Sequence, residues 1–263
     1  MKIPIITYHA IGDVASPLWT SAESFERHLQ ALAANGFQTV SLSDAIAAMK
    51  GQQTLPPKPI VLTFDDGYAS VAEQAWERLA HWGFSATVFL VTDYCGKTNY
   101  WPGQPRTMPE MPLLSWKQIE ALAADGCEFG AHTKDHCALP LLTKEAIARQ
   151  LSASQEAIAT RTGQCANTFA YPYGLSDAKT IAITSEYFDG AVGTALGIAS
   201  EKDNLFRLPR IDSYYLNTFW IERLHTQTFS QYIKLRQILR TTKRLVQPDY
   251  VPAPANEVAN ARV

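Results

Sequence analysis

Cysteine is scarce in this sequence of 263 residues. The four that occur, Cys95, Cys127, Cys137 and Cys165, show no CxxC spacing. We therefore expect reduced thiols, most of which fill the core.

Long apolar runs and a dominant charge are also absent. No run of about 18 apolar residues occurs, so we expect no membrane-spanning helix. The opening residues, MKIPIITYHAIGD, hold too short an apolar run for a signal peptide, which predicts a cytoplasmic location. With 46% hydrophobic residues, 18% charged residues and a formal net charge of −2, the chain resembles an ordinary globular protein. Nucleic acid is therefore not an expected partner, and nothing in the residues specifies an oligomeric state.

Short apolar runs alternate with longer segments of helical periodicity. The strand-like runs include IITYH (5–9), PIVLTF (59–64), SATVFLV (85–91) and CEFGA (127–131). This alternation predicts parallel βαβ units in one α/β domain, arranged either as a β/α barrel or as a doubly wound sheet.

The end of the chain differs in composition from the rest. From about residue 247 the apolar periodicity is lost, and proline and alanine become frequent. We therefore predict one domain over residues 1–246 and a frayed tail over residues 247–263.

Polar residues follow several of the predicted strands. His9 ends the first strand, Asp65 and Asp66 follow PIVLTF, His132 follows CEFGA, and Tyr173 follows TFAYP. A single histidine or a lone DDG after a strand is more often structural. In parallel β/α folds, however, the carboxyl ends of the strands gather on one face, where active sites lie. All five residues together predict an active site.

The adjacent carboxylates of Asp65 and Asp66 suggest a bound cation. Mutual repulsion and desolvation both oppose two like charges at the end of a buried strand unless a positive group lies beside them. In HTKDH (132–136), two imidazoles four positions apart can bind one metal ion from a helical turn or a tight loop. Together with a carboxylate from another strand end, they supply three ligands and leave positions open for water and substrate.

Three motifs resemble a known family. TFDDGY (63–68), HTKDHCALPLLT (132–143) and FAYPYG (169–174), in that order and spacing, resemble the polysaccharide deacetylase family, carbohydrate esterase family 4. The resemblance extends over roughly residues 3 to 212. It implies a single-domain, distorted β/α barrel with about seven parallel strands. It also implies metal-dependent removal of N-acetyl groups from amino-sugar residues of a glycan or glycan precursor.

The resemblance assigns roles to individual residues. Asp66, His132 and His136 become the metal ligands, and Asp65 becomes the general base. The backbone N–H of Tyr173 becomes an oxyanion donor. Zinc is the expected ion for two histidines and one aspartate, and cobalt or nickel fits the same ligands.

One position departs from the family pattern. The family's third motif has an arginine two residues before its proline, bonded to the catalytic aspartate, whereas this chain has Ala170 there. Arg210 is our candidate for the substitute, and the alternative is that it forms a salt bridge at the barrel rim. Asp212 is a candidate to orient a catalytic imidazole.

The general acid has two candidate positions. Most family members carry it in a late apolar-x-Leu-x-His strand motif, which IERLH (221–225) matches in its letters. However, the spacing of the apolar residues over 217–229 predicts a helix there. IITYH is a strand that ends in His9, and the first and last strands of a closed barrel can be neighbours. We therefore predict His9 as the general acid and His225 as a residue on a helix surface.

Aromatic residues in the loop 94–116 could stack on sugar rings, and Trp101 is the one that we select as a substrate-binding residue, with Tyr173. The predicted substrate is a carbohydrate that contains an N-acetylated amino sugar.

Two other functions remain open. One is hydrolysis of a different small amide or ester, because the ligand set does not depend on what carries the acyl group. The other is a catalytically inactive carbohydrate-binding relative, which only Ala170 favours.

Overall fold

Seven parallel strands form a closed ring. The computed structural model describes residues 1–14, 16, 18–105 and 107–246, so the predicted tail 247–263 lies outside the described residues and the predicted domain boundary stays a prediction. The order around the ring is β2-β12-β10-β9-β8-β7-β6, and β6 pairs with β2 to close it. An eighth strand, β5, pairs in parallel with the start of β6. The strands are β2 (Ile5–Tyr8), β5 (Gln38–Thr39), β6 (Pro59–Phe64), β7 (Thr87–Leu90), β8 (Glu128–Ala131), β9 (Thr168–Ala170), β10 (Gly190–Leu196) and β12 (Leu208–Asp212).

Every pairing within the ring is parallel. The barrel expected from the sequence is therefore confirmed, and the doubly wound sheet is excluded. Two short pairs lie outside the ring. β1 (Lys2–Ile3) pairs antiparallel with β11 (Ala199–Ser200), and β3 (Ala10–Ile11) pairs parallel with β4 (Trp19–Thr20).

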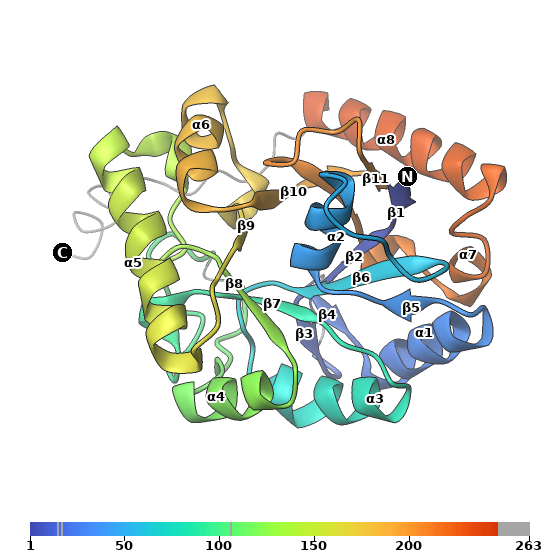
Figure 1. Ribbon diagram of the computed structural model, residues 1–263, viewed down its shortest axis with the longest axis horizontal. Helices are drawn as coiled ribbons and strands as arrows, with labels where there is room; N and C mark the ends of the chain where they lie inside the picture. Colours follow the sequence, from blue (N-terminus) through green and yellow to red (C-terminus); the bar gives the residue numbers. More distant parts are fainter. Residues whose placement is uncertain (15, 17, 106, 247–263) are drawn as a thin grey trace.

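Helices surround the ring, and α2 (Leu42–Met49) lies over one end of it (Figure 1). They are α1 (Ala22–Ala34), α2 (Leu42–Met49), the π-helix η1 (Val71–Ala75) that continues into α3 (Trp76–His81), α4 (Trp116–Ala124), α5 (Lys144–Thr162), α6 (Ala178–Tyr187), α7 (Thr218–Ile221) and α8 (Gln227–Val246). Among the described residues, no helix is both long enough and apolar enough to cross a membrane.

The strands separate two apolar cores. Since side chains alternate between the two faces of a strand, β2 sends Ile6 and Tyr8 outward into the core beneath the surrounding helices. Ile5 points the other way, into a smaller core that it shares with Val61 of β6 and Ile46 of α2. Apolar side chains from α2 thus fill one end of the barrel, which leaves the carboxyl ends of the strands at the other end for polar residues.

The structure bears on two local predictions. All four cysteines are free. Cys127 is buried in the core, Cys95 and Cys137 pack against it, and Cys165 is exposed, so most of the cysteines belong to the core as predicted. The prediction of one continuous helix over 217–229 is wrong, because α7 ends at Ile221 and α8 begins only at Gln227. Thr226 accounts for the break, since its hydroxyl accepts the backbone N–H of Phe229 at 3.2 Å and so caps a new helix start.

Candidate active site

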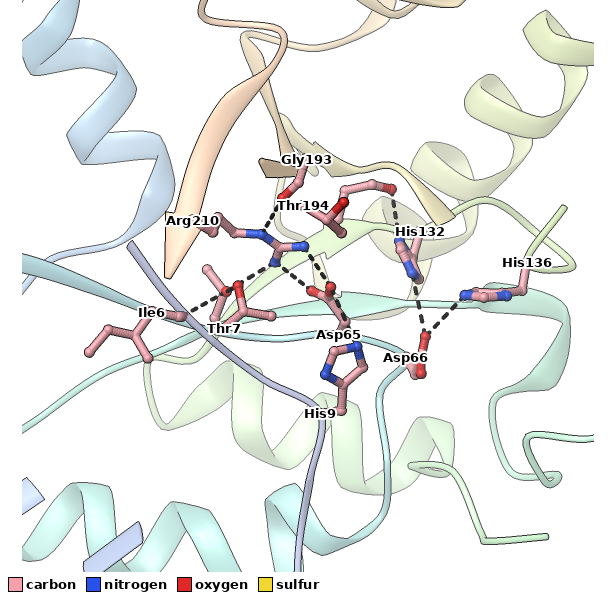
Figure 2. A network of polar contacts seen from close by, with 12 residues as sticks. Ile6, Thr7, His9, Asp65, Asp66, His132, His136, Gly193, Thr194 and Arg210 are labelled. Carbon is pink, nitrogen blue, oxygen red and sulfur yellow. Dashed lines mark hydrogen bonds and ion pairs between the residues drawn. The ribbon is translucent and has the colours of Figure 1, made fainter. Parts of the chain in front are cut away.

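The two aspartates leave β6 through a sharp left-handed turn. Asp66 has φ 70° and Gly67 has φ 72°. Aspartate tolerates this conformation better than most residues. Gly67 lies in the left-handed region that favours glycine, and a Cβ at this position would also lie 2.8 Å from Leu90 Cδ2. The turn directs the two adjacent carboxylates toward different partners (Figure 2).

Asp65 forms a bidentate ion pair with Arg210. The guanidinium Nη1 and Nη2 atoms each donate to one carboxylate oxygen at 2.7 Å. Arg210 is itself fixed, because Nη1 also donates to the Thr63 hydroxyl at 3.1 Å and Nε donates to the Gly193 carbonyl at 2.9 Å. Burial acts to raise the pKa of Asp65, but the Arg210 charge outweighs it and holds the pKa below its usual value. Asp65 is therefore ionised at neutral pH.

Arg210 lies inside the barrel rather than at its rim. Its side chain is only 3% exposed, and β12 brings it to the interior face of the strand ring. The structure thus pairs the candidate arginine of β12 with Asp65 at the end of β6, with only strand β2 between them in the ring.

Asp66 faces two imidazoles. Its Oδ1 atom lies 3.4 Å from His132 Nε2 and 3.2 Å from His136 Nε2, and all three side chains are buried. Burial acts to raise the pKa of Asp66, but the two adjacent imidazoles have the larger effect and hold this pKa well below its usual value. The carboxylate is therefore ionised. The three possible ligand atoms all lie within 4.8 Å of one another.

The second nitrogen of His132 determines how these groups can interact. Nδ1 lies 2.7 Å from the Ala170 carbonyl oxygen. Since a carbonyl only accepts, Nδ1 carries the proton, and a neutral His132 presents the Nε2 lone pair to Asp66. A lone pair and a carboxylate that face each other call for a cation between them. Two nitrogen atoms and one oxygen atom in this arrangement fit a divalent metal ion.

Both histidines come from one tight loop, not from a helical turn. Thr133 and His136 have φ values of 64° and 58°. Backbone bonds hold the loop against the segment after β7, where Asp93 N donates to Lys134 O at 2.9 Å. Gln150 of α5 accepts from Lys134 N at 2.9 Å. The spacing of the two imidazoles therefore depends on this loop conformation.

Aromatic rings enclose His136. The Trp101 ring centroid lies 4.2 Å from that of His136, at an interplanar angle of 31°, and the Tyr173 ring packs against it at 4.5 Å and 70°. Trp101 is only 3% exposed. One face of its indole is thus occupied by an imidazole, while the residue also lines the cavity, so its predicted contact with the substrate stays a prediction.

Tyr173 lies on a turn pressed against β10. It belongs to the short helix η4 (Pro172–Gly174), where its φ is 58°. A Cβ at Gly174 would lie 2.0 Å from the Thr194 hydroxyl, so only glycine allows this close approach. The turn brings Tyr173 to the wall of the same cavity as the aspartates.

His9 lies on the opposite side of Asp65 from Arg210. Its Nε2 atom is 4.0 Å from Asp65 Oδ2, and its side chain is 20% exposed. His225 is exposed in the turn between α7 and α8, where it stacks on Phe37 at 5.1 Å, so it is a surface residue but not a helical one. Asp212 lines the cavity, and its carboxylate accepts the backbone N–H of Tyr214 at 2.8 Å.

A cavity of ≈ 350 Å³ brings these residues together. Its walls include all eight predicted site residues, namely His9, Asp65, Asp66, Trp101, His132, His136, Tyr173 and Arg210. Sequence reasoning missed the contribution of β10. The register of β10 against β12 shifts between Val192 and Leu196, and this irregularity turns the Gly193 carbonyl toward Arg210. Gly193 within a strand-like run was the only signal for it.

The wall also includes a residue from the end of the described chain. Arg240 of α8 lines the cavity, and its Nη1 atom donates to the Thr194 carbonyl at 2.8 Å. Gln237 of the same helix donates to the Leu196 carbonyl at 2.6 Å. α8 thus holds the irregular part of β10 from outside the barrel.

The chain is similar in sequence to known polysaccharide deacetylases. A sequence model of polysaccharide deacetylases matches residues 52–187, just over half of the chain. The Bacillus subtilis protein YxkH, a polysaccharide deacetylase by name, is 26% identical over 211 residues, which cover 80% of this chain and 71% of YxkH. A poly-β-1,6-N-acetyl-D-glucosamine N-deacetylase of Staphylococcus epidermidis is 26% identical over 200 residues, which cover 72% of this chain and 66% of the relative. The chain thus spans about two thirds of the length of these relatives.

A solved structure shares the fold. The Streptococcus pyogenes deacetylase PplD, in complex with acetate, matches with a TM-score of 0.73 over 85% of this chain and 96% of its own. The two sequences are 24% identical.

Proposed function

The chain belongs to the polysaccharide deacetylase family and is a polysaccharide N-deacetylase, and we propose that it hydrolyses N-acetyl groups of a glycan in a metal-dependent reaction. The observation that carries the proposal is the separation of two adjacent carboxylates. Asp65 pairs with an arginine, while Asp66 faces two imidazoles in an arrangement that fits a cation.

Asp66, His132 and His136 would hold the metal. Their donor atoms favour zinc, and cobalt or nickel fits the same set. A divalent cation supplies a Lewis acid beside the acetyl group and lowers the pKa of water. The Ala170 carbonyl fixes the tautomer of His132, and Trp101 and Tyr173 fix the ring of His136.

Asp65 acts as the general base. Its ion pair with Arg210 keeps the carboxylate ionised and oriented, so it takes the proton of the water that adds to the acetyl carbon. The backbone N–H of Tyr173, on its left-handed turn at the cavity wall, donates to the oxyanion that develops.

His9 acts as the general acid. It lies within 4.0 Å of Asp65, so both residues reach the same reacting centre. As the C–N bond breaks, His9 protonates the amine nitrogen of the sugar, and the products are acetate and a free amino sugar.

The substrate that we propose is a glycan containing N-acetylglucosamine. The name of the staphylococcal relative, a poly-β-1,6-N-acetyl-D-glucosamine N-deacetylase, supports this choice. The catalytically inactive alternative has no support beyond Ala170, because Arg210 occupies the position beside Asp65 that the missing arginine would take.

Acetate release tests the proposal. Purified protein is treated with a chelator and assayed on β-1,6- and β-1,4-linked N-acetylglucosamine oligomers, with and without added Zn²⁺. We expect acetate only after metal is restored. Acetate release that continues at the same rate in the chelator would contradict the metal-dependent mechanism, and no release from either series with metal present would contradict the substrate.

A further inference from the structure

A second cavity adjoins the catalytic one and has no part in the mechanism above. It has a volume of ≈ 390 Å³ and is lined by β4, the first two turns of α1 and the segment that follows β12. Half of its lining residues are serine or threonine, among them Thr20 and Ser213. The aromatic ring of Tyr214 and the amide of Asn217 complete the part of the wall that follows β12.

The two cavities share a boundary. Leu18 and Asp212 line the catalytic cavity, and the next residue after each, Trp19 and Ser213, lines the second. The hydroxyls of Thr20 and Ser213 lie 2.9 Å apart and join the two chain segments at this boundary. The two cavities therefore lie side by side, with these two chain segments between them.

The position of the second cavity matches the side on which the sugar must lie. This step rests on the proposed function, in which the acetyl group faces Asp66 and His132 and the amine nitrogen faces His9. β8, which carries His132, lies across the ring from the adjacent strands β2 and β12. The sugar bonded to that nitrogen thus extends toward β2 and β12. The next sugar of the glycan then reaches the second cavity.

The lining carries no unpaired charge that would select an anion. Arg27 is the one arginine or lysine in the wall, and it forms an ion pair with Glu23 on the same helix. His28 is buried, and burial lowers its pKa to about 4, so its ring is neutral at neutral pH. The other polar groups of the wall are hydroxyls and the amide of Asn217. Thr20 bonds with Ser213, Ser21 bonds with Ser24, and Asn217 Oδ1 accepts the backbone N–H of Trp220. Each hydroxyl and the amide still have further hydrogen-bonding capacity for a ligand. These groups suit a neutral polyhydroxylated molecule better than a phosphate or a carboxylate.

Tyr214 supplies the apolar part of such a site. It is 72% exposed, the largest exposed fraction among the large apolar side chains of the described residues. Its ring makes an edge contact with Tyr215 at 5.4 Å, which restricts its orientation. An exposed ring with an apolar face and a polar hydroxyl is suited to pack on the C–H face of a sugar.

We propose that the second cavity is a subsite for a further sugar unit of the same glycan, on the side of the departing amine, and that Tyr214 is its stacking platform. The enzyme therefore acts on oligomers in preference to short fragments.

Chain-length dependence tests the subsite. The variant Tyr214→Ala is compared with Phe219→Ala, a control that removes another exposed aromatic ring, 49% exposed, which lines neither cavity. Kinetics are measured with β-1,6- and β-1,4-linked N-acetylglucosamine dimers and pentamers in the presence of Zn²⁺. We expect Tyr214→Ala to raise KM for the pentamer about 2- to 10-fold, with kcat and the dimer kinetics unchanged.

A second variant blocks the cavity instead of removing its platform. Thr218 is exposed at the cavity wall, so Thr218→Trp adds bulk there without disturbing the core. We expect it also to raise KM for the pentamer alone. If Tyr214→Ala and Thr218→Trp both keep the chain-length dependence of Phe219→Ala, the subsite is wrong.

Binding separates this inference from the proposed function. Calorimetry with the Asp65→Asn protein measures dissociation constants for the dimer and the pentamer without turnover. The proposed function fails if no acetate is released from any oligomer. The subsite still stands in that case if the pentamer binds more tightly than the dimer and the added change Tyr214→Ala abolishes this difference in affinity. Equal binding of both oligomers, or none, overturns the subsite.

Discussion

Asp65 and Asp66 are consecutive residues, yet they share no partner within hydrogen-bonding distance. Asp65 is balanced by Arg210, a cation of the chain itself, at 2.7 Å. Asp66 faces His132 and His136, which balance a carboxylate only when they are protonated or when a cation lies between. The left-handed backbone at Asp66 produces this separation. One strand end can therefore hold two negative charges because each is neutralised from a different direction.

This comparison predicts different tasks for the two carboxylates, and its strongest consequence concerns Asp65. The change Asp65→Asn removes the proton acceptor but keeps the shape and leaves the imidazoles untouched. We expect kcat to fall by about 10²- to 10⁴-fold. Steady-state acetate release measures this effect, and a variant that keeps most of its turnover would place the base elsewhere.

The next consequence concerns the acid on the other side of Asp65. We expect His9→Ala to lower kcat by about 10²-fold or more and to remove the basic limb of the pH–rate profile. His225→Ala is the matched control, because it removes an exposed imidazole that stacks on Phe37 away from the cavity. A severe loss in His225→Ala with normal rates in His9→Ala would reverse the assignment.

Arg210 provides a smaller and more specific test. It holds the pKa of Asp65 below the usual value, so its removal raises that pKa and Asp65 becomes protonated at a higher pH. The acidic limb of the pH–rate profile of Arg210→Gln is expected to move up by about 1 to 3 units. Arg210→Lys keeps the charge without the bidentate geometry and should move it less. An unshifted acidic limb in Arg210→Gln would show that the ion pair does not tune the base.

The smallest expected effect concerns His28. At Asp65 the charged partner outweighs the effect of burial on the pKa, whereas at His28 burial has the larger effect. Its imidazole contacts the Tyr8 hydroxyl at 3.1 Å, and its pKa is lowered to about 4. The unfolded chain, with an ordinary histidine pKa of about 6.5, binds the proton first as the pH falls. Stability is therefore complete above about pH 6.5 and declines toward pH 4 by about 2 to 3 kcal/mol.

Urea unfolding between pH 7 and pH 4.5 measures this decline. His28→Gln keeps a polar side chain but cannot take up the proton, so its stability should depend less on pH over this interval. Parallel pH dependence in the two proteins would assign the acid sensitivity to other groups.

The same comparison explains what the sequence could predict. Asp66, His132 and His136 could be predicted, because they follow strand ends and belong to short motifs. The alternation of strands and helices predicted parallel βαβ units, and the resemblance of the three motifs to a known family predicted the barrel. Arg210 was only one of two alternatives, since its partner depends on how β12 faces the interior. The position of the Gly193 carbonyl depends on a shift of register between β10 and β12; a glycine within a strand-like run is a signal for such an irregularity but does not specify its geometry.

Loops account for the remaining differences. The sequence predicts Trp101 as a substrate-binding aromatic residue in a long loop, but it does not predict that the fold of this loop packs the indole against His136. The break between α7 and α8 follows from a threonine cap within an otherwise helical pattern. Both outcomes depend on tertiary contacts, which periodicity does not report.

Metal content tests the division between the two carboxylates most directly. Asp65→Asn and Asp66→Asn are the same change at neighbouring positions, and each protein is saturated with Zn²⁺, desalted and measured by elemental analysis. We expect Asp65→Asn to retain one zinc per chain, as the unmodified protein does, and Asp66→Asn to lose most of it, because only Asp66 lies beside both imidazoles. Equal zinc content in the two variants, or loss in Asp65→Asn alone, would contradict the account.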